Sequence, residues 1–442
     1  MTASGICLYR CVTDGEDELM LAHSRQPIPA VIQQHAEESA ILRHVRSSLV
    51  RAPHVKLHHL RRLDERLAAH LDGLAVAGDA GSRLCTGALE TPGVGEVFAA
   101  TVLAIEHKDS TRLDRLFALA ATLPQARRGL TSAFGWVSAH DLKGIVAELL
   151  ASRLSIRREI GIAACAMHRL DPGAMLTEAC NDPDPSLRAR AFRAAGELGR
   201  RDLRPACAQG LKDEDDLARF QAASSALLLG DRDRSLAVLE GFAANPNPCR
   251  ARALRLWLTA VDAPSAHRLL KTIAQDPANR RLLIQGAGSA GDAHYIPWLI
   301  GQMADDRLAR LAGESFSFVT GLDLADRDLE RPPPEGLEPG PNDDPEDPDT
   351  AMDEDDGLPW PDAVKLQDWW DANQTGFPPG RRVFLGEPVS VGYCRRVLRD
   401  GFQRQRSAAA IVLSLLQPGT PLFPTHQPAW RQARLLGAGE WS

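Results

Sequence analysis

Aromatic residues are scarce in this chain: Phe, Trp and Tyr together make up 5% of its 442 residues. Strands rely on aromatic and β-branched side chains, so this composition disfavours a sandwich or a barrel. Alanine, leucine and arginine are abundant instead, and all three are good helix formers. A chain of this length is also too long for one small core. The composition therefore predicts closely packed helices in two or more domains or in an extended array.

Long apolar runs are missing as well. No stretch of 18 or more apolar residues occurs, which predicts no membrane span. The first 25 residues hold no basic segment followed by an apolar core, so they do not resemble a secretory signal. The helical pattern begins only near Pro29, and Met20 is an alternative first residue. We therefore expect residues 1–26 to be disordered or to reflect a misassigned start.

The cysteines show no spacing typical of a disulfide framework. Free cysteine packs like a small apolar residue, and several of these lie on apolar faces of predicted helices. The sequence thus favours buried, reduced thiols in a cytoplasmic protein over a disulfide-linked one. The eight positions are Cys7, Cys11, Cys85, Cys165, Cys180, Cys207, Cys249 and Cys394.

An excess of positive charge is also absent, since the net charge is −7. Nine acidic residues lie between Asp343 and Asp356, so the remainder of the chain carries about +2. This balance does not indicate a protein that binds nucleic acid directly through its net charge.

What the chain does have is a repeat. A short turn signature recurs every 29 to 31 positions from about residue 139 to residue 323, with helix-length apolar stretches between. The clearest marks are Leu170-Asp171, Leu198-Gly199, Gly230-Asp231, Val261-Asp262, Gly291-Asp292 and Gly321 with Asp323. A second mark lies out of phase, as in Asn181-Asp182-Pro183, Asn245-Pro246-Asn247 and Asp276-Pro277. Such a period predicts stacked helix pairs.

One unit shows the expected local chemistry. Asp184 can cap a helix that begins after it, and Gly199 can end that helix in the left-handed conformation. Pro205 falls in the first turn of the next helix, where its missing N–H costs least. Alanines on the helix faces permit close stacking.

The whole pattern predicts an all-α fold: a HEAT-like α-solenoid of stacked helix pairs with an N-terminal helical cap and a C-terminal helical region. We divide the chain into an N-terminal helical region (27–138), the repeat array (139–330), an acidic, proline-rich flexible insert (331–361) and a C-terminal helical region with its tail (362–442). The insert holds too few apolar residues to fold alone.

Signatures of catalysis and of metal or cofactor binding are weak. Residues 286–291 match G-x-G-x-x-G, but a dinucleotide site needs a strand before that motif, and here the register predicts a turn between helices. His54 and His58 would share a helix face, as metal ligands do, yet no acidic or cysteine partner accompanies them and His59. We predict neither an enzyme nor a bound cofactor or metal.

The strongest charge and aromatic features lie close together. The acidic run is either a solvated linker or a docking site for a basic partner. The tryptophans that follow it are either a binding hot spot or the core that closes one end of the solenoid. The candidate protein-binding residues are Asp353, Glu354, Asp355, Asp356, Trp360, Trp369 and Trp370.

Several strings resemble an uncharacterised family of bacterial HEAT-repeat proteins, from about residue 27 to residue 436. They are Pro27-Ile28-Pro29, Gln34-His35-Ala36-Glu37-Glu38, Leu63-Asp64-Glu65-Arg66-Leu67, His70-Leu71-Asp72-Gly73-Leu74, Arg404-Gln405-Arg406 and Pro421-Leu422-Phe423. Genes of this family often lie beside genes for type VI secretion spikes, PAAR tips and toxins.

The resemblance implies a cytoplasmic protein whose partner is a secreted toxin encoded nearby. The expected role is that of an immunity protein that binds and neutralises the toxin. The alternative is an adaptor or chaperone that loads the toxin onto the spike. A HEAT-like lyase or a general scaffold is a more distant alternative.

Overall fold

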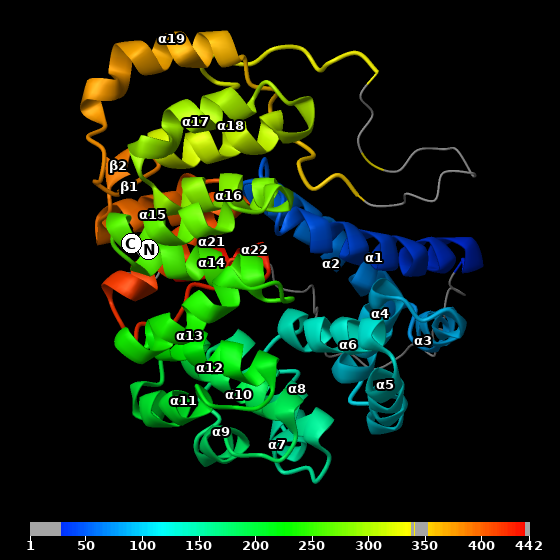
Figure 1. Cartoon of the computed structure of the whole chain (residues 1–442). Coiled ribbons are helices and arrows are strands. Elements are labelled where there is room, and N and C mark those ends of the chain that lie inside the picture. The colour runs from blue at the N-terminus through cyan, green and yellow to red at the C-terminus, as the bar shows by residue number, and fades with distance from the viewer. Residues whose placement is uncertain (1–27, 337–339, 341–351, 438–442) are drawn as a thin grey trace, which may run out of the picture.

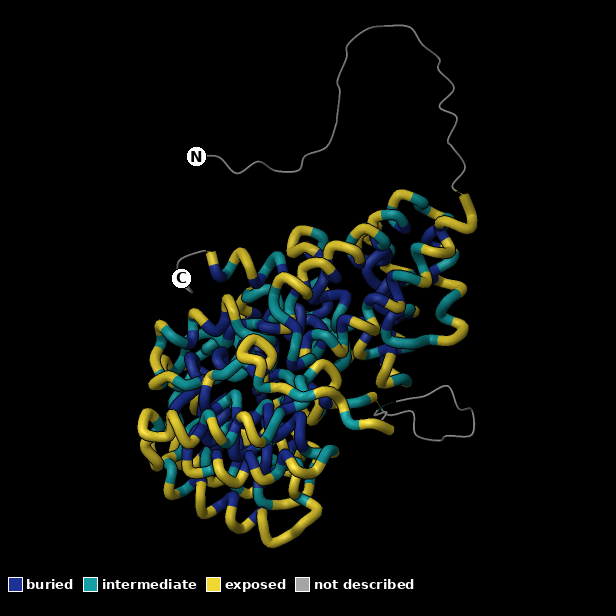
Figure 2. Tube along the Cα trace, turned by 90° about the horizontal axis from the view of Figure 1, so that it is seen from above, coloured by how far each residue is buried: buried dark blue, intermediate teal, exposed yellow. Residues whose placement is uncertain are grey.

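The computed structural model describes residues 28–336, 340 and 352–437. Its regular structure is helical apart from one two-stranded antiparallel sheet, β1 (Val383–Phe384) with β2 (Glu387–Pro388). Within these residues the protein is an all-α solenoid, which confirms the predicted fold class. Buried residues gather between the helix layers, and exposed ones cover the loops and outer turns (Figure 2).

Six helices make up the N-terminal region: α1 (Pro29–Leu49), α2 (Leu57–Val76), α3 (Asp79–Gly87), α4 (Val94–Glu106), α5 (Ser110–Thr122) and α6 (Pro124–Trp136). α4 is the most apolar of them and is buried from Val97 to Ile105. It packs against α1 and α6, so the apolar stripes of those two helices close over it.

The array consists of two layers of helices. The inner layer contains α8 (Ser155–His168), α10 (Pro185–Leu198), α12 (Asp216–Leu228), α14 (Arg250–Ala260), α16 (Arg280–Ala290) and α18 (Asp306–Thr320). The outer layer contains α7 (Ile145–Leu150), α9 (Ala174–Ala179), α11 (Arg204–Gly210), α13 (Asp233–Ala244), α15 (Ala263–Ile273) and α17 (Ile296–Gln302). Successive inner helices contact one another and continue the row that begins with α6 (Figure 1).

The turns have the chemistry expected from the sequence. The carboxylate of Asp184 accepts a hydrogen bond from the backbone N–H of Ser186, and Asp215 and Asp305 cap α12 and α18 in the same way. Gly199 ends α10 with φ +67° and Gly321 ends α18 with φ +77°, a conformation that glycine adopts without strain. The predicted turn signature is therefore confirmed at these positions.

One arginine recurs near the start of each inner helix, eleven residues before the turn. The members of this arginine ladder are Arg127, Arg158, Arg188, Arg219, Arg250, Arg280 and Arg310. Arg188 is typical: it donates to both carboxylate oxygens of Asp213 at 2.7 and 2.8 Å and to the carbonyl of Asp182 at 2.9 Å. The guanidinium groups of Arg158 and Arg250 likewise satisfy carbonyls of the preceding loop and bond a side chain of the following one.

The C-terminal region contains α19 (Ala363–Asn373), α20 (Val391–Asp400), α21 (Gln403–Leu416) and α22 (Ala429–Gly437). α19 packs on α17 and extends the array by one more layer. α21 contacts α12 and α14, and α22 contacts α2, so these two helices lie between the repeats and the N-terminal helices (Figure 1). The inner side of the solenoid is thus partly filled by the chain itself.

Residues 418–432, which we name the C-terminal strap, cross the array in reverse order. The N–H of Gly419 donates to the Leu228 carbonyl at the end of α12 (3.0 Å), and that of Leu422 donates to Glu197 at the end of α10 (3.1 Å). Further along, Gln427 donates to Met167 at the end of α8, and Arg431 donates to Gly135 at the end of α6 (2.7 Å). The strap therefore satisfies carbonyls that four inner helices leave without intrahelical partners.

Candidate functional site

The acidic candidates do not form a free docking surface. Asp353 forms an ion pair with Arg310 at 2.7 Å, and both oxygens of Asp355 accept from Arg281 at 2.9 Å. Asp355 is only 3% exposed, whereas the side chains of Glu354 and Asp356 are exposed. Arg310 is the last member of the ladder, and Asp353 takes the place of the acid that a further repeat would supply.

The second part of the predicted insert is therefore not simply solvated. Residues 352–361 pack on α16 and α18, where two arginines offset the charges that would otherwise keep the segment in water. Arg331 also donates its backbone N–H to the Trp360 carbonyl at 2.8 Å, which joins the two ends of the insert. Residues 337–339 and 341–351 lie outside the described residues.

The three tryptophans belong to the core that closes the array. Trp370 is 6% exposed, and Trp369 packs edge-on against Phe316 with ring centres 5.9 Å apart. Trp360 lies between the guanidinium groups of Arg310 and Arg331, 4.7 and 5.4 Å from its ring centre. These positions favour the core interpretation over a binding hot spot.

The glycine-rich motif and the histidines also have structural explanations. Residues 286–290 lie inside α16, and a Cβ on Gly288 would approach the Cα of Ser315 to 3.0 Å, so this glycine permits the close contact with α18. His58 and His59 pack against each other with ring centres 4.0 Å apart. Among the described residues, no group of three His, Cys, Asp or Glu side chains is placed to hold a metal ion. The six cysteines in that part of the chain are free and buried, as predicted.

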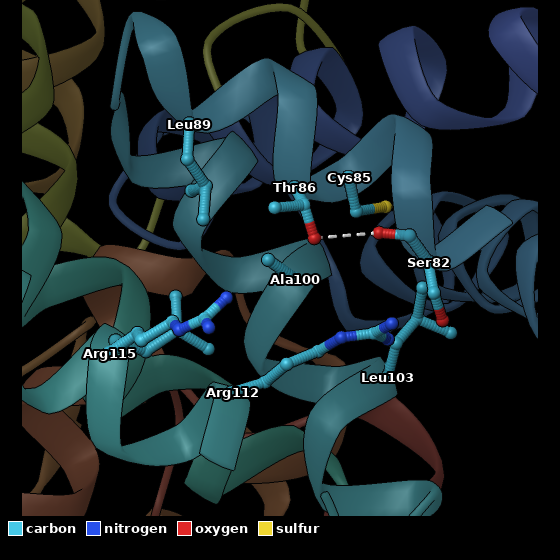
Figure 3. A pocket seen from close by; sticks show the side chains of 9 residues that line it. Ser82, Cys85, Thr86, Leu89, Ala100, Leu103, Arg112 and Arg115 are labelled. Carbon is cyan, nitrogen blue, oxygen red and sulfur yellow. Dashed lines mark hydrogen bonds between the residues drawn. The ribbon is translucent and has the colours of Figure 1, made fainter. Parts of the chain in front are cut away.

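A small pocket lies between α3, α4 and α5 (Figure 3). Its volume of about 40 Å³ has room for about three water molecules. Burial raises the pKa of the Cys85 thiol to about 12, so this group stays protonated and is a poor nucleophile. Thr86 uses its hydroxyl to bond the Ser82 carbonyl at 2.8 Å. The pocket thus offers neither an activated group nor room for a substrate.

The most unusual surface is a group of arginines on the inner side of the array. Arg190 and Arg193 on α10 are repeated by Arg252 and Arg255 on α14, 62 residues later and at the same distance from the helix end. Arg404, at the start of α21, lies close enough to Arg255 for its charge to act there, and Arg51, at the end of α1, acts on Arg252 in the same way. We name this group the arginine cluster: Arg51, Arg190, Arg193, Arg252, Arg255 and Arg404.

The cluster is only partly neutralised. Arg190 and Arg193 share Glu197 at 2.5 and 2.7 Å. Arg404 pairs with Glu314 at 2.6 Å and donates to the carbonyl of Arg51 at 3.0 Å, which holds α21 against the end of α1.

The remaining arginines of the cluster form no ion pair among the described residues, although the charge of Glu314 acts on Arg255. Arg252 lies over the ring of Phe220, with its Cζ 4.9 Å from the ring centre. Within the described part of the chain, no carboxylate forms an ion pair with Arg51, Arg252 or Arg255.

The arginines of the cluster influence one another electrostatically. Arg252 and Arg255 are exposed to solvent, yet burial by surrounding protein lowers their pKa, as do the charges of Arg193 and Arg404. Burial also acts to raise the pKa of Glu197, but Arg190 and Arg193 outweigh it and hold that pKa at about 2. These side chains reach solvent while protein and like charges surround them, so solvent screens the repulsion between the arginines less than it would on an open surface.

His426, on the strap, lies close enough to the arginine cluster for the charges of Arg51 and Arg193 to act on it. Burial lowers its pKa to about 4, together with the charges of Arg51, Arg193, Arg46 and Arg406. The imidazole is therefore neutral at physiological pH and adds no positive charge there. Sequence reasoning missed the cluster, although the repeated Arg-x-x-Arg spacing at 190–193 and 252–255 was a visible signal.

Comparison with protein families finds a match to HEAT repeats over residues 173–259. The matched stretch runs from the start of α9 to the end of α14 and contains Arg190, Arg193, Arg252 and Arg255. Comparisons with curated proteins and with solved structures find no match. No helix in the described ranges is long and apolar enough to cross a membrane. The chain is an all-α solenoid whose central repeats are similar to HEAT repeats, the repeat type of many protein-interaction scaffolds.

Proposed function

We propose that the protein is a cytoplasmic immunity protein that binds a type VI secretion toxin and neutralises it. The observation that carries the scaffold role is the HEAT-like array, whose repeats present a long continuous surface and whose inner side holds an uncompensated group of charges. The toxin as partner is supported by the family resemblance of the N-terminal and C-terminal strings.

The proposed action needs no bond making by this chain. A stable complex buries roughly 1,200–2,000 Å² of surface, which a solenoid of this size can supply from several neighbouring repeats. Burial of that extent over the active surface of a toxin would exclude its substrate. Charges at the edge of such an interface speed encounter, and those at its centre select the partner.

The test begins with the toxin encoded beside this gene. Co-expression of the two proteins should yield a complex that co-purifies, and cells carrying both should survive toxin expression that kills cells carrying the toxin alone. Survival without this protein, at equal toxin levels, would end the immunity proposal.

The alternative, an adaptor, predicts a different outcome of the same experiment. An adaptor would co-purify with the toxin and with the spike protein but would leave the toxin active. Toxin activity measured in the purified complex separates the two roles, because only an immunity protein abolishes it.

A further inference from the structure

The array already binds one acidic peptide, its own segment 352–358. Arg281 holds the Asp355 carboxylate with two parallel bonds of 2.9 Å, and Arg310 donates to the Asp353 carboxylate at 2.7 Å and to the Asp355 carbonyl at 3.1 Å. Paired bonds of this geometry are how arginine recognises planar carboxylates. The inner helices α16 and α18 are therefore a carboxylate-binding surface that is occupied.

The arginine cluster continues that surface. Arg404 donates to the carbonyl of Glu354 at 2.7 Å and pairs with Glu314 of α18 at 2.6 Å, so it touches both the bound acidic segment and the cluster. Arg255 lies beside Arg404, whose charge lowers its pKa. Beyond Arg404 the row of arginines goes on along α14 and α10, with no acidic segment among the described residues to cover it.

The uncovered part carries a large excess of positive charge. Six arginines of the cluster face only two glutamates, Glu197 and Glu314. Holding like charges together on one surface is unfavourable, and an anion that binds there is attracted by the arginines that have no ion-pair partner. The arrangement is therefore suited to a ligand that carries several negative charges along its length.

The surroundings favour carboxylates over nucleic acid. Proteins that hold single strands stack the bases on exposed aromatic rings. Phe220, over which Arg252 lies, is only 2% exposed and has no free face for a base. The occupied surface next to it, on the inner helices α16 and α18, binds aspartates.

We propose that the arginine cluster is a docking site for an extended, acidic segment of the partner protein, which would lie along α14 and α10 as residues 352–358 lie along α16 and α18. This inference rests on the proposed role as a protein-binding scaffold, and it does not require the partner to be a toxin.

The test uses the full-length protein and a fluorescent synthetic peptide of aspartate and glutamate residues. Binding is followed by fluorescence anisotropy at several salt concentrations. The variant Arg252→Gln with Arg255→Gln removes two exposed, unpaired charges. The control variant Arg62→Gln with Arg66→Gln removes two exposed charges from α2. Circular dichroism and the Tm of each variant show that the fold is retained.

The Kd of the peptide should rise by roughly tenfold in the cluster variant, which corresponds to about 1.4 kcal/mol, and should stay within about twofold in the control. The dependence of log Kd on log salt concentration should also become shallower only in the cluster variant. Equal binding by the wild type and the cluster variant would overturn the proposal, as would tighter binding of an oligonucleotide of equal charge.

Two further arms separate the possible occupants. A variant with Asp343, Asp344, Glu346, Asp347 and Asp349 replaced by Ser tests whether the chain fills its own site. If the peptide binds only to this variant, the acidic residues of the chain itself occupy the arginine cluster in the wild type, and the proposal of a partner segment is wrong. Peptide binding that depends on the cluster while the neighbouring toxin stays active would support the site and reject the immunity role.

Discussion

Asp64 of α2 connects the N-terminal helices to the C-terminal strap. It is fully buried, pairs with Arg46 at 2.6 Å and accepts the backbone N–H of Ala429 at 2.7 Å. Arg46 in turn donates to the carbonyl of His426 at 3.1 Å. A buried carboxylate is tolerated only when its oxygens are satisfied, and here the acceptors and donors come from α1, α2 and the strap.

Replacing Asp64 with Ala should therefore lower the free energy of unfolding by about 3–5 kcal/mol, because Arg46 would remain buried without its partner. Urea unfolding followed by circular dichroism measures this change. Glu65→Ala is the matched control, since its pair with Arg61 is more than half exposed and should contribute less than about 0.5 kcal/mol. Similar losses in both variants would contradict the assigned role of Asp64.

His168 predicts a dependence on pH. Its Nε2 lies 2.8 Å from the Phe134 carbonyl, and burial together with the charge of Arg431 lowers its pKa to about 4. As the pH falls, the imidazole of His168 takes up a proton near pH 6.5 in the unfolded chain but only at a lower pH in the folded protein. Stability linked to His168 is therefore complete above about pH 6.5 and is lost as the pH falls toward 4.

When the pH falls from 7 to 5, the free energy of unfolding of the wild type should drop by about 1–2 kcal/mol more than that of the variant His168→Gln, by the same linkage. Urea unfolding at the two pH values measures the difference. His140→Gln, at a largely exposed position, should keep the wild-type dependence. A variant His168→Gln with an unchanged pH profile would show that the imidazole is not neutral in the fold.

At the scale of the helix, close approach decides where small residues are needed. α1 and α4 meet at Gly95, where a Cβ would lie 2.2 Å from the Ala40 carbonyl oxygen and 2.6 Å from its Cα. Both atoms belong to the backbone of α1 and cannot move aside alone. Gly241 in α13 has nothing within 4 Å of the same position.

The two glycines should respond in opposite directions to alanine. Gly95→Ala should destabilise the protein by about 1–3 kcal/mol through overpacking. Gly241→Ala should stabilise it by about 0.5–1 kcal/mol, because alanine loses less backbone freedom in a helix. Thermal unfolding of both variants tests the pair, and a tolerated Gly95→Ala would mean that the two helices are farther apart than described.

The helices of the array are largely predictable because their signals are local. Each of the three residues Asp184, Gly199 and Pro205 affects only the helix end at which it lies, and each has the predicted position. Glycine has a low helix propensity, so Gly73 and Gly81 taken alone would favour a loop. Both lie inside helices, α2 and α3, because burial of the apolar stripe outweighs that propensity. Trp369 could have been core or interface, and only its contact with Phe316, more than fifty positions away, decides between them.

At the scale of the whole molecule, the strap changes how the solenoid is held together. An open array couples only neighbouring repeats. Here Arg431 reaches α6 and Gln427 reaches α8, while Arg201 of the array donates to Pro418 at 3.0 Å. These bonds join positions more than two hundred residues apart, so no local pattern in the sequence predicts them.

Arg431→Ala should therefore have distant effects. The substitution removes the donors that bond the Gly135 and Trp136 carbonyls at 2.7 and 2.9 Å, and it should lower the free energy of unfolding by about 1.5–3 kcal/mol. Amide hydrogen exchange should accelerate in α6 and also in α10 and α12, to which Arg431 makes no hydrogen bond. Arg234→Ala, at an exposed position paired only with Asp231, is the control. Faster exchange confined to α6 and α22 would show that the strap does not couple the repeats.

The reverse course of the strap also sets an order of events in time. Repeats of a solenoid can form as they leave the ribosome, one after another, because each needs only its neighbour. The carbonyls at the ends of α6, α8, α10 and α12 gain their partners only when Gly419, Leu422, Gln427 and Arg431 have been made, and all four are synthesised after these helices. Until then the inner side of the array is open, so a partner present during synthesis would meet a wider and less crowded surface than the finished protein offers.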